Sequence, residues 1–237
     1  MKIALASARM IDRDINYNLS QLQRYMKEAK ANGADIVCFG EAFLQGFNVL
    51  SWQYEEDRKI ALTTSSQVFM QIKALTKKFG IDVLFGYNEL EEDTLYSSCA
   101  LIADGEIFHN YRRISRGWKE YSKTDGHYKE GSTVEVFDYK GKKCVIGLCG
   151  DLWDYPERFA LGEDLLLWPV YVCWTKEEWE NGGKLEYAEQ AKLCCENSLY
   201  INSICEGDAI GGAAQFFRGN IPRELPILKE GLIVIDI

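Results

Sequence analysis

The chain has 237 residues, of which 47% are hydrophobic and 27% are charged, which is the composition of an ordinary soluble globular protein. The formal net charge of −9 argues against nucleic acid or an anionic membrane surface as the main partner. No apolar run is long enough for a signal peptide or a membrane span, so we expect a cytoplasmic protein.

The cysteine and histidine content bears on redox chemistry and on metals. Eight cysteines are present, mostly inside apolar stretches, and without a secretion signal they indicate reduced thiols. Only two histidines occur, His109 and His127, and no Cys-x-x-Cys pair is found. This combination argues against a zinc site, and nothing in the pattern calls for a metal or an organic cofactor.

The first elements predict a parallel strand pair. A strand is expected over residues 2–7, and the helix that follows is expected to be capped by Asn16 or Asn18 and to end near Gly33. A second strand is expected over residues 34–39. Strand, helix and strand with short connections form a βαβ opening.

The rest of the chain continues as a mixture of helices and strands. Asp104-Gly105 and Lys140-Gly141 each separate two strand-like runs and predict hairpins. The remaining elements are expected as a helix over 65–79, a strand over 81–87, a strand over 165–168 that Pro169 ends, a helix over 185–197, and strands over 199–205 and 232–237. No repeat or linker interrupts the chain, so residues 1–237 are expected to form one α/β domain.

Two predicted strands end in a potentially reactive side chain. Residues 145–148 form an apolar run that ends in Cys149 and Gly150, and the strand over 34–39 leads directly into Gly40 and Glu41. The edge of an α/β sheet where strands end is where such folds place their chemistry. Cys149 is thus a candidate nucleophile, and Glu41, among apolar neighbours and partly desolvated, a candidate general base. The alternatives are a merely packed thiol and a solvated loop carboxylate.

A segment dense in cations lies between the two hairpins. Residues 111–120 include Arg113, Lys119 and Glu120. Such cations could lower the pKa of a nearby thiol and stabilise a developing oxyanion. The alternative is a solvated basic loop.

This chain order resembles the nitrilase superfamily of carbon–nitrogen hydrolases. The specific parts are Gly40-Glu41-Ala42-Phe43, and the stretch from Leu148-Cys149-Gly150 to Pro156-Glu157, which looks like the nucleophile motif of the superfamily. The resemblance covers nearly the whole chain. It implies a four-layer α-β-β-α sandwich and a Glu-Lys-Cys triad.

By this resemblance Glu41 is the general base, Cys149 the nucleophile and Glu120 the second glutamate. The place of the lysine holds Arg113, and Lys119 is the only nearby lysine that could substitute for it. Arginine keeps the positive charge but is larger and cannot act as an acid near neutral pH.

The resemblance implies a hydrolase that acts on a small amide or nitrile, amidase-like, through a cysteine thioester, and at least a homodimer. Three alternatives remain open. The chain could be a catalytically silent nitrilase-like subunit for binding or assembly, which Arg113 favours. His109 could pair with Cys149 in a cysteine–histidine hydrolase. The chemistry could persist with either Lys119 or Arg113 as its cation.

Overall fold

Two six-stranded sheets form the centre of the molecule. The computed structural model describes all residues, 1–237. The first sheet has the order β12 (Gly231–Asp236), β1 (Lys2–Ser7), β2 (Ile36–Cys38), β3 (Asp82–Glu91), β4 (Thr94–Ala103) and β5 (Glu106–Arg112). The second has the order β11 (Asn220–Leu225), β10 (Ala213–Phe217), β9 (Asn197–Asn202), β8 (Leu165–Val170), β7 (Lys142–Ile146) and β6 (Phe137–Tyr139).

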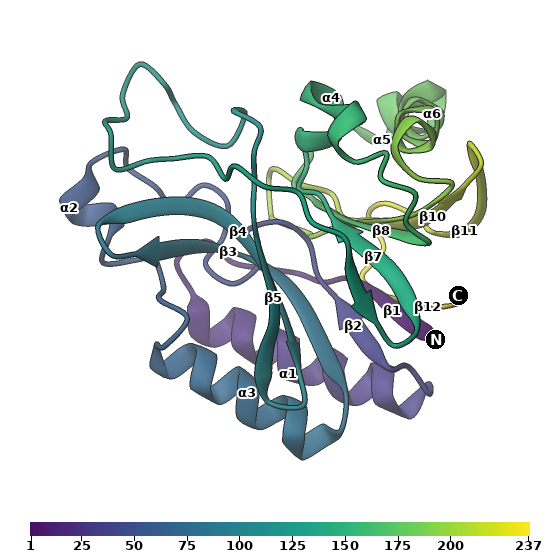
Figure 1. Ribbon diagram of the computed structural model, residues 1–237, viewed down its shortest axis with the longest axis horizontal. Helices are drawn as coiled ribbons and strands as arrows, with labels where there is room; N and C mark the ends of the chain where they lie inside the picture. The colour runs from purple at the N-terminus through teal and green to yellow at the C-terminus, as the bar shows by residue number, and fades with distance from the viewer.

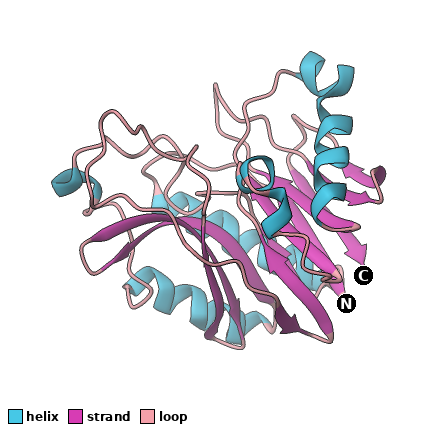
Figure 2. Ribbon diagram, turned by 45° about the horizontal axis from the view of Figure 1, so that its top comes forward, coloured by secondary structure: helices cyan, strands magenta, loops and turns pink.

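Helices cover the outer faces of the two sheets (Figure 1, Figure 2). On the first sheet lie α1 (Ile15–Ala31) and α3 (Gln67–Phe79). On the second lies α6 (Lys184–Cys194), with the shorter helical turns α4 (Asp151–Asp154), η1 (Pro156–Arg158), α5 (Lys176–Glu178) and η2 (Trp179–Gly183) beside it. A further turn, α2 (Tyr54–Asp57), lies in the connection between β2 and α3. The expected four-layer α-β-β-α sandwich is therefore confirmed.

Alternating side chains of the strands supply two cores. Ile3 and Leu5 of β1 face the second sheet and join a core of 36 buried residues, while Ala4 and Ala6 face the helices and join a core of 24. This follows from the two-residue period of a strand. Because both faces are covered, β1 and β2 read as apolar runs rather than as alternating patterns.

The predicted parallel pair and both hairpins are confirmed. β1 and β2 pair in parallel with Ile3 opposite Ile36. β4 and β5 form the Asp104-Gly105 hairpin, and β6 and β7 form the Lys140-Gly141 hairpin. The elements that position both candidate residues were thus predictable from local pattern.

Three details differ from the sequence-based expectations. Asp14, not Asn16 or Asn18, caps α1 by accepting from the N–H of Tyr17, while Asn18 is buried. Pro169 does not end a strand but lies inside β8, where its carbonyl accepts from the N–H of Cys149 at 3.0 Å. The hairpin of β10 and β11 was not predicted.

No helix of the structure combines the length and the apolar character that crossing a bilayer requires.

Candidate active site

Glu41 follows β2 by three residues and lies between the two sheets. Its side chain is fully buried, and its backbone N–H donates to the carbonyl of Val170 at the end of β8. Ala42 turns the chain with a φ of 51°, which is uncommon for a residue other than glycine. On the other side lies Gly86 of β3, where an added Cβ would be 2.6 Å from the Cα of Glu41. The backbone around Glu41 is therefore held tightly on both sides.

The two carboxylate oxygens of Glu41 have different surroundings. Oε1 accepts from Arg113 Nη1 at 2.9 Å and from Ser97 Oγ at 3.0 Å. Oε2 is also buried and has no hydrogen-bond partner. A buried oxygen without a partner is costly, so Oε2 is the position from which this carboxylate can take a proton.

Arg113 follows β5 and is held rigidly. Its side chain is 3% exposed, and its Nε donates to Ser115 Oγ at 2.7 Å. Burial alone would lower the pKa of Arg113, but the charges of Glu41 and Cys149 raise it above its ordinary range. An added Cβ on Gly150 would lie 2.6 Å from Arg113 Nη2. The guanidinium therefore packs against the residue that directly follows Cys149.

Cys149 leaves β7 in a left-handed backbone conformation, with a φ of 43°. Strained positions of this kind are often found at functional sites. Its carbonyl accepts from Trp168 Nε1 at 3.0 Å, and its Sγ contacts the carbonyl of Tyr171 at 3.6 Å. The thiol thus lies just beyond the carboxyl end of β7, at the strand end where the sequence predicts it.

The pKa of the Cys149 thiol is raised to about 12, chiefly by burial and next by the negative charge of Glu41. Arg113 opposes this shift but does not overcome it. Arg113 thus lowers the thiol pKa, as expected of a nearby cation, but burial and the charge of Glu41 outweigh it and the net shift is upward. The reason is that Arg113 is itself paired with Glu41, which leaves desolvation dominant.

Asp151 ties the nucleophile turn to the segment that carries Arg113. Its carboxylate accepts from the backbone N–H groups of Leu148, Ile114 and Ser115, at 2.7 to 3.0 Å. The hydroxyl of Tyr111 also donates to it, at 2.6 Å. Cys149 and Arg113 thus come from distant parts of the chain but share one buried anchor.

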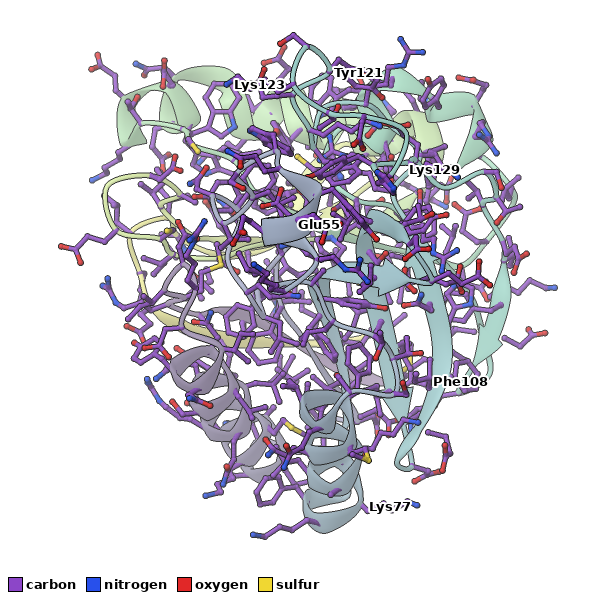
Figure 3. All side chains as sticks on the ribbon, turned by 90° about the vertical axis from the view of Figure 1, so that its left-hand side faces the viewer. Glu55, Lys77, Phe108, Tyr121, Lys123 and Lys129 are labelled. Carbon is purple, nitrogen blue, oxygen red and sulfur yellow. The ribbon has the colours of Figure 1, made fainter.

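Lys119 and Glu120 lie elsewhere in the long loop between β5 and β6. The ammonium of Lys119 donates to the carbonyl of Tyr128 and pairs with Glu130 at 3.1 Å. The side chain of Glu120 is exposed and makes no hydrogen bond. Tyr121 of the same loop lies at one end of the molecule, opposite Lys77 of α3 (Figure 3). The structure joins Glu41, Arg113 and Cys149 but records no contact of Lys119 or Glu120 with them.

The structure also adds residues that the sequence reasoning missed. Ser97 orients Glu41, Ser115 orients Arg113, and Trp168 orients the nucleophile turn. No local pattern marks Ser97, because its partner Glu41 is 56 residues away in sequence, whereas Ser115 lies only two residues after its partner Arg113. Asp151 lies inside the motif that follows Cys149, but the sequence did not indicate that its carboxylate accepts from three backbone N–H groups.

His109 does not take part in this cluster. It lies on β5, and its ring stacks on Phe137 with the centroids 4.3 Å apart. No interaction joins it to Cys149. The geometry gives no support to a cysteine–histidine pair.

The two sheets and their outer helices place the protein in the class of four-layer α-β-β-α sandwich proteins, with Glu41 and Cys149 at strand ends and Arg113 directly after β5. The family model for carbon-nitrogen hydrolases matches residues 2–161, which is more than half of the chain. The chain belongs to the carbon-nitrogen hydrolase family, within the nitrilase superfamily.

Two relatives illustrate the range of the family. A glutamine-dependent NAD(+) synthetase of Thermotoga maritima is 27% identical over 173 residues, covering 70% of this chain and 29% of that protein. An N-carbamoylputrescine amidase of Arabidopsis thaliana is 27% identical over 170 residues, covering 67% of this chain and 55% of that protein. The matched segment covers 29% of the first relative and 55% of the second, so the chain spans less than two thirds of the length of either.

The fold likeness extends over the whole chain. An amidase from Nesterenkonia sp. AN1 superposes with a TM-score of 0.80 at 21% identity, covering 100% of this chain and 92% of that one. A mutant of that amidase, with a TM-score of 0.77 at 20% identity and covering 100% and 93%, shows the Michael addition of acrylamide at its active site cysteine.

Proposed function

We propose that the protein hydrolyses a small amide through a thioester on Cys149, with Glu41 as general base and Arg113 as the fixed cation. The observation that carries this proposal is the difference in surroundings between the two carboxylate oxygens of Glu41. One carboxylate oxygen is held by Arg113 and Ser97, while the other is buried and unpartnered. The amidase relatives and the cysteine adduct of the Nesterenkonia amidase support the assignment.

The first half of the reaction forms the thioester. Glu41 takes the proton of the Cys149 thiol while the sulfur attacks the amide carbon, and the carbonyl electrons move onto oxygen. The tetrahedral oxyanion then collapses, the C–N bond breaks, and protonated Glu41 delivers its proton to the leaving amine or ammonia.

The second half releases the acid. Glu41, again ionised, removes a proton from water while the water oxygen attacks the thioester carbon. The C–S bond breaks, the sulfur takes the proton back from Glu41, and the carboxylic acid leaves. No charge accumulates over the complete cycle except the ordinary ionisation of the product.

The raised pKa of Cys149 fits this order of events. Because the free thiol is protonated at neutral pH, its proton must be removed as the substrate is attacked rather than beforehand. A general base with an available oxygen is then required, which is what Glu41 offers.

Arg113 has an electrostatic role in this proposal. Its Nη2 packs against Gly150, and with the backbone N–H of Gly150 it would face the developing oxyanion. Lys119 is already paired with Glu130, and Glu120 is exposed, so neither is assigned to a step.

The second candidate is a catalytically silent nitrilase-like subunit for binding or assembly. Arg113 in the usual place of lysine, locked in a buried ion pair with Glu41, is the observation that favours it. For either function we propose a homodimer or larger assembly, supported by membership of the superfamily and testable by sedimentation.

The deciding experiment is intact-protein mass spectrometry after brief exposure to a panel of simple amides, with the wild type beside Cys149→Ala. An acyl adduct or ammonia release that disappears in the variant supports the hydrolase. Release that persists in the variant contradicts the role of Cys149. Absence of any adduct or release across the panel supports the silent subunit.

A further inference from the structure

The backbone of Cys149 is held by two consecutive residues of β8. Its N–H donates to the carbonyl of Pro169, and its carbonyl accepts from Trp168 Nε1, both at 3.0 Å. The φ of Cys149 is 43°, a conformation that residues other than glycine keep only where the surrounding structure enforces it. The two bonds from β8 therefore help to keep the nucleophile in its left-handed conformation.

The bond from Trp168 also sets the direction of the next backbone amide. In a trans peptide the C=O and N–H groups point in opposite directions. Because the carbonyl of Cys149 points at the indole, the N–H of Gly150 points away from it. That N–H has no acceptor within the protein, and an added Cβ on Gly150 would lie 2.6 Å from Arg113 Nη2. A free backbone donor thus lies directly after the nucleophile and beside a buried cation.

Trp168 is itself fixed by aromatic packing. Its side chain is fully buried, and it stacks on Tyr187 of α6 with the ring centroids 5.1 Å apart and meets Tyr200 edge to face at 6.1 Å. Trp179 belongs to the same cluster, since it is also buried and stacks on Tyr200. Its Nε1, however, has no hydrogen-bond partner. Of these two buried indoles, only Trp168 is bonded to the backbone of Cys149.

We propose that Trp168 is a positioning residue for the oxyanion. By holding the carbonyl of Cys149, it directs the N–H of Gly150 toward the substrate oxygen, although it touches no reacting atom itself. A donor whose direction is fixed beforehand stabilises the oxyanion without reorganising during the reaction. This inference rests on the proposed amide hydrolysis, to which it adds a residue of β8 that acts through the peptide of the nucleophile.

The kinetic test compares Trp168→Phe with the matched control Trp179→Phe. Each substitution removes one buried indole N–H from the aromatic cluster, but only the first removes a bond to Cys149. Loss of an oxyanion donor typically costs about 10²–10³ in rate, and a misdirected donor should cost less. We expect Trp168→Phe to lower kcat by about tenfold or more with little change in KM, and Trp179→Phe to change neither. Equal kcat values for the two variants overturn the proposal.

An isostere separates the hydrogen bond from the shape of the ring. Benzothienylalanine at position 168 keeps both fused rings but has sulfur in place of the Nε1–H group, and it should reproduce the loss of kcat. Full activity of this protein overturns the proposal.

An aldehyde with the same chain as the amide reads the oxyanion site without a leaving group. When Cys149 adds to it, the S–C bond forms, the thiol proton passes to Glu41, and the carbonyl oxygen becomes the oxyanion. The affinity for the aldehyde should fall by about the same factor as kcat when benzothienylalanine stands at position 168. An unchanged affinity overturns the proposal.

A further measurement does not depend on turnover. Cysteine is followed by glycine only at Cys149–Gly150, so ¹³C in the cysteine carbonyls and ¹⁵N in the glycine amides select this one peptide group by NMR. Its carbonyl signal should move upfield when benzothienylalanine replaces Trp168, and an unmoved signal overturns the anchor. If the wild type turns over no amide and binds no aldehyde but the signal moves, the proposed hydrolysis fails while the anchor stands.

Discussion

Arg113 Nη1 donates to Glu41 Oε1 across 2.9 Å, and the two side chains are only 3% and 0% exposed. A buried ion pair of this kind is costly to break from one side, because the remaining charge has no compensation. The pair is therefore expected to matter for stability and, under the proposed mechanism, for catalysis.

Replacing Arg113 alone should destabilise the fold. We expect Arg113→Met to lower the free energy of unfolding by about 3–5 kcal/mol, because it leaves the Glu41 carboxylate buried without its cation. Urea denaturation measures this loss. The double variant Glu41→Gln/Arg113→Met should recover much of it, since no buried charge remains. A double variant as unstable as the single one would show that the unpaired Glu41 carboxylate is not the cause of the loss.

The cation of the reaction can be identified by comparing two substitutions. Arg113→Lys keeps a positive charge but loses the bond to Ser115, whereas Lys119→Met removes the ammonium that pairs with Glu130. If Arg113 stabilises the oxyanion, Arg113→Met should lower kcat by about 10²–10³, with Arg113→Lys intermediate. Lys119→Met should leave kcat within a few-fold. The reverse order would assign the role to Lys119.

The reactivity of Cys149 should depend on pH in a specific way. Its pKa of about 12 lies above the ordinary thiol value of 9.0, so little thiolate is present near pH 8 and alkylation should rise steadily to above pH 10. Glu41→Gln removes the nearby negative charge and should shift this profile to lower pH. Iodoacetamide rates at Cys149, measured by peptide mass spectrometry, test both statements. A plateau below pH 8 in the wild type would be incompatible with them.

Asp151 should contribute more to stability than a single hydrogen bond. Asp151→Ala leaves the N–H groups of Leu148, Ile114 and Ser115 buried without an acceptor, at about 1–3 kcal/mol for each. The matched change Tyr111→Phe removes one donor and should cost about 1 kcal/mol. Denaturation of the two variants under identical conditions gives the comparison. Equal losses would show that the backbone bonds to Asp151 carry little free energy.

Gly86 is expected to tolerate no side chain. A Cβ there would lie 2.4 Å from the N of Ala42 and 2.6 Å from the Cα of Glu41, so Gly86→Ala must displace the turn that carries the base. We expect a loss of stability of about 1–3 kcal/mol together with a fall in kcat. Gly126→Ala is the control, because its added Cβ meets nothing within 4 Å. Similar behaviour of the two variants would exclude the steric explanation.

Much of the architecture follows from local pattern. Apolar runs and the dipeptides Asp104-Gly105 and Lys140-Gly141 place the central strands and the two hairpins, and they put Glu41 and Cys149 at strand ends. The hairpin of β10 and β11 is not predictable in this way, because its strands carry no clear alternation. Pro169, which has no N–H to donate, predicts the end of a strand, but in β8 it still lies in register opposite Ile201 of β9.

From the sequence, periodicity predicts the strands that lead into Glu41 and Cys149, and the resemblance of the motifs around these two residues implies the family and the sandwich. The packing of distant segments, which local pattern does not encode, brings Arg113 to Glu41 and Lys119 to Glu130. It also decided the sign of the shift in the pKa of Cys149. Both depend on burial and on partners far apart along the chain, and desolvation inside the closed sandwich outweighs the charge of one arginine that is already paired.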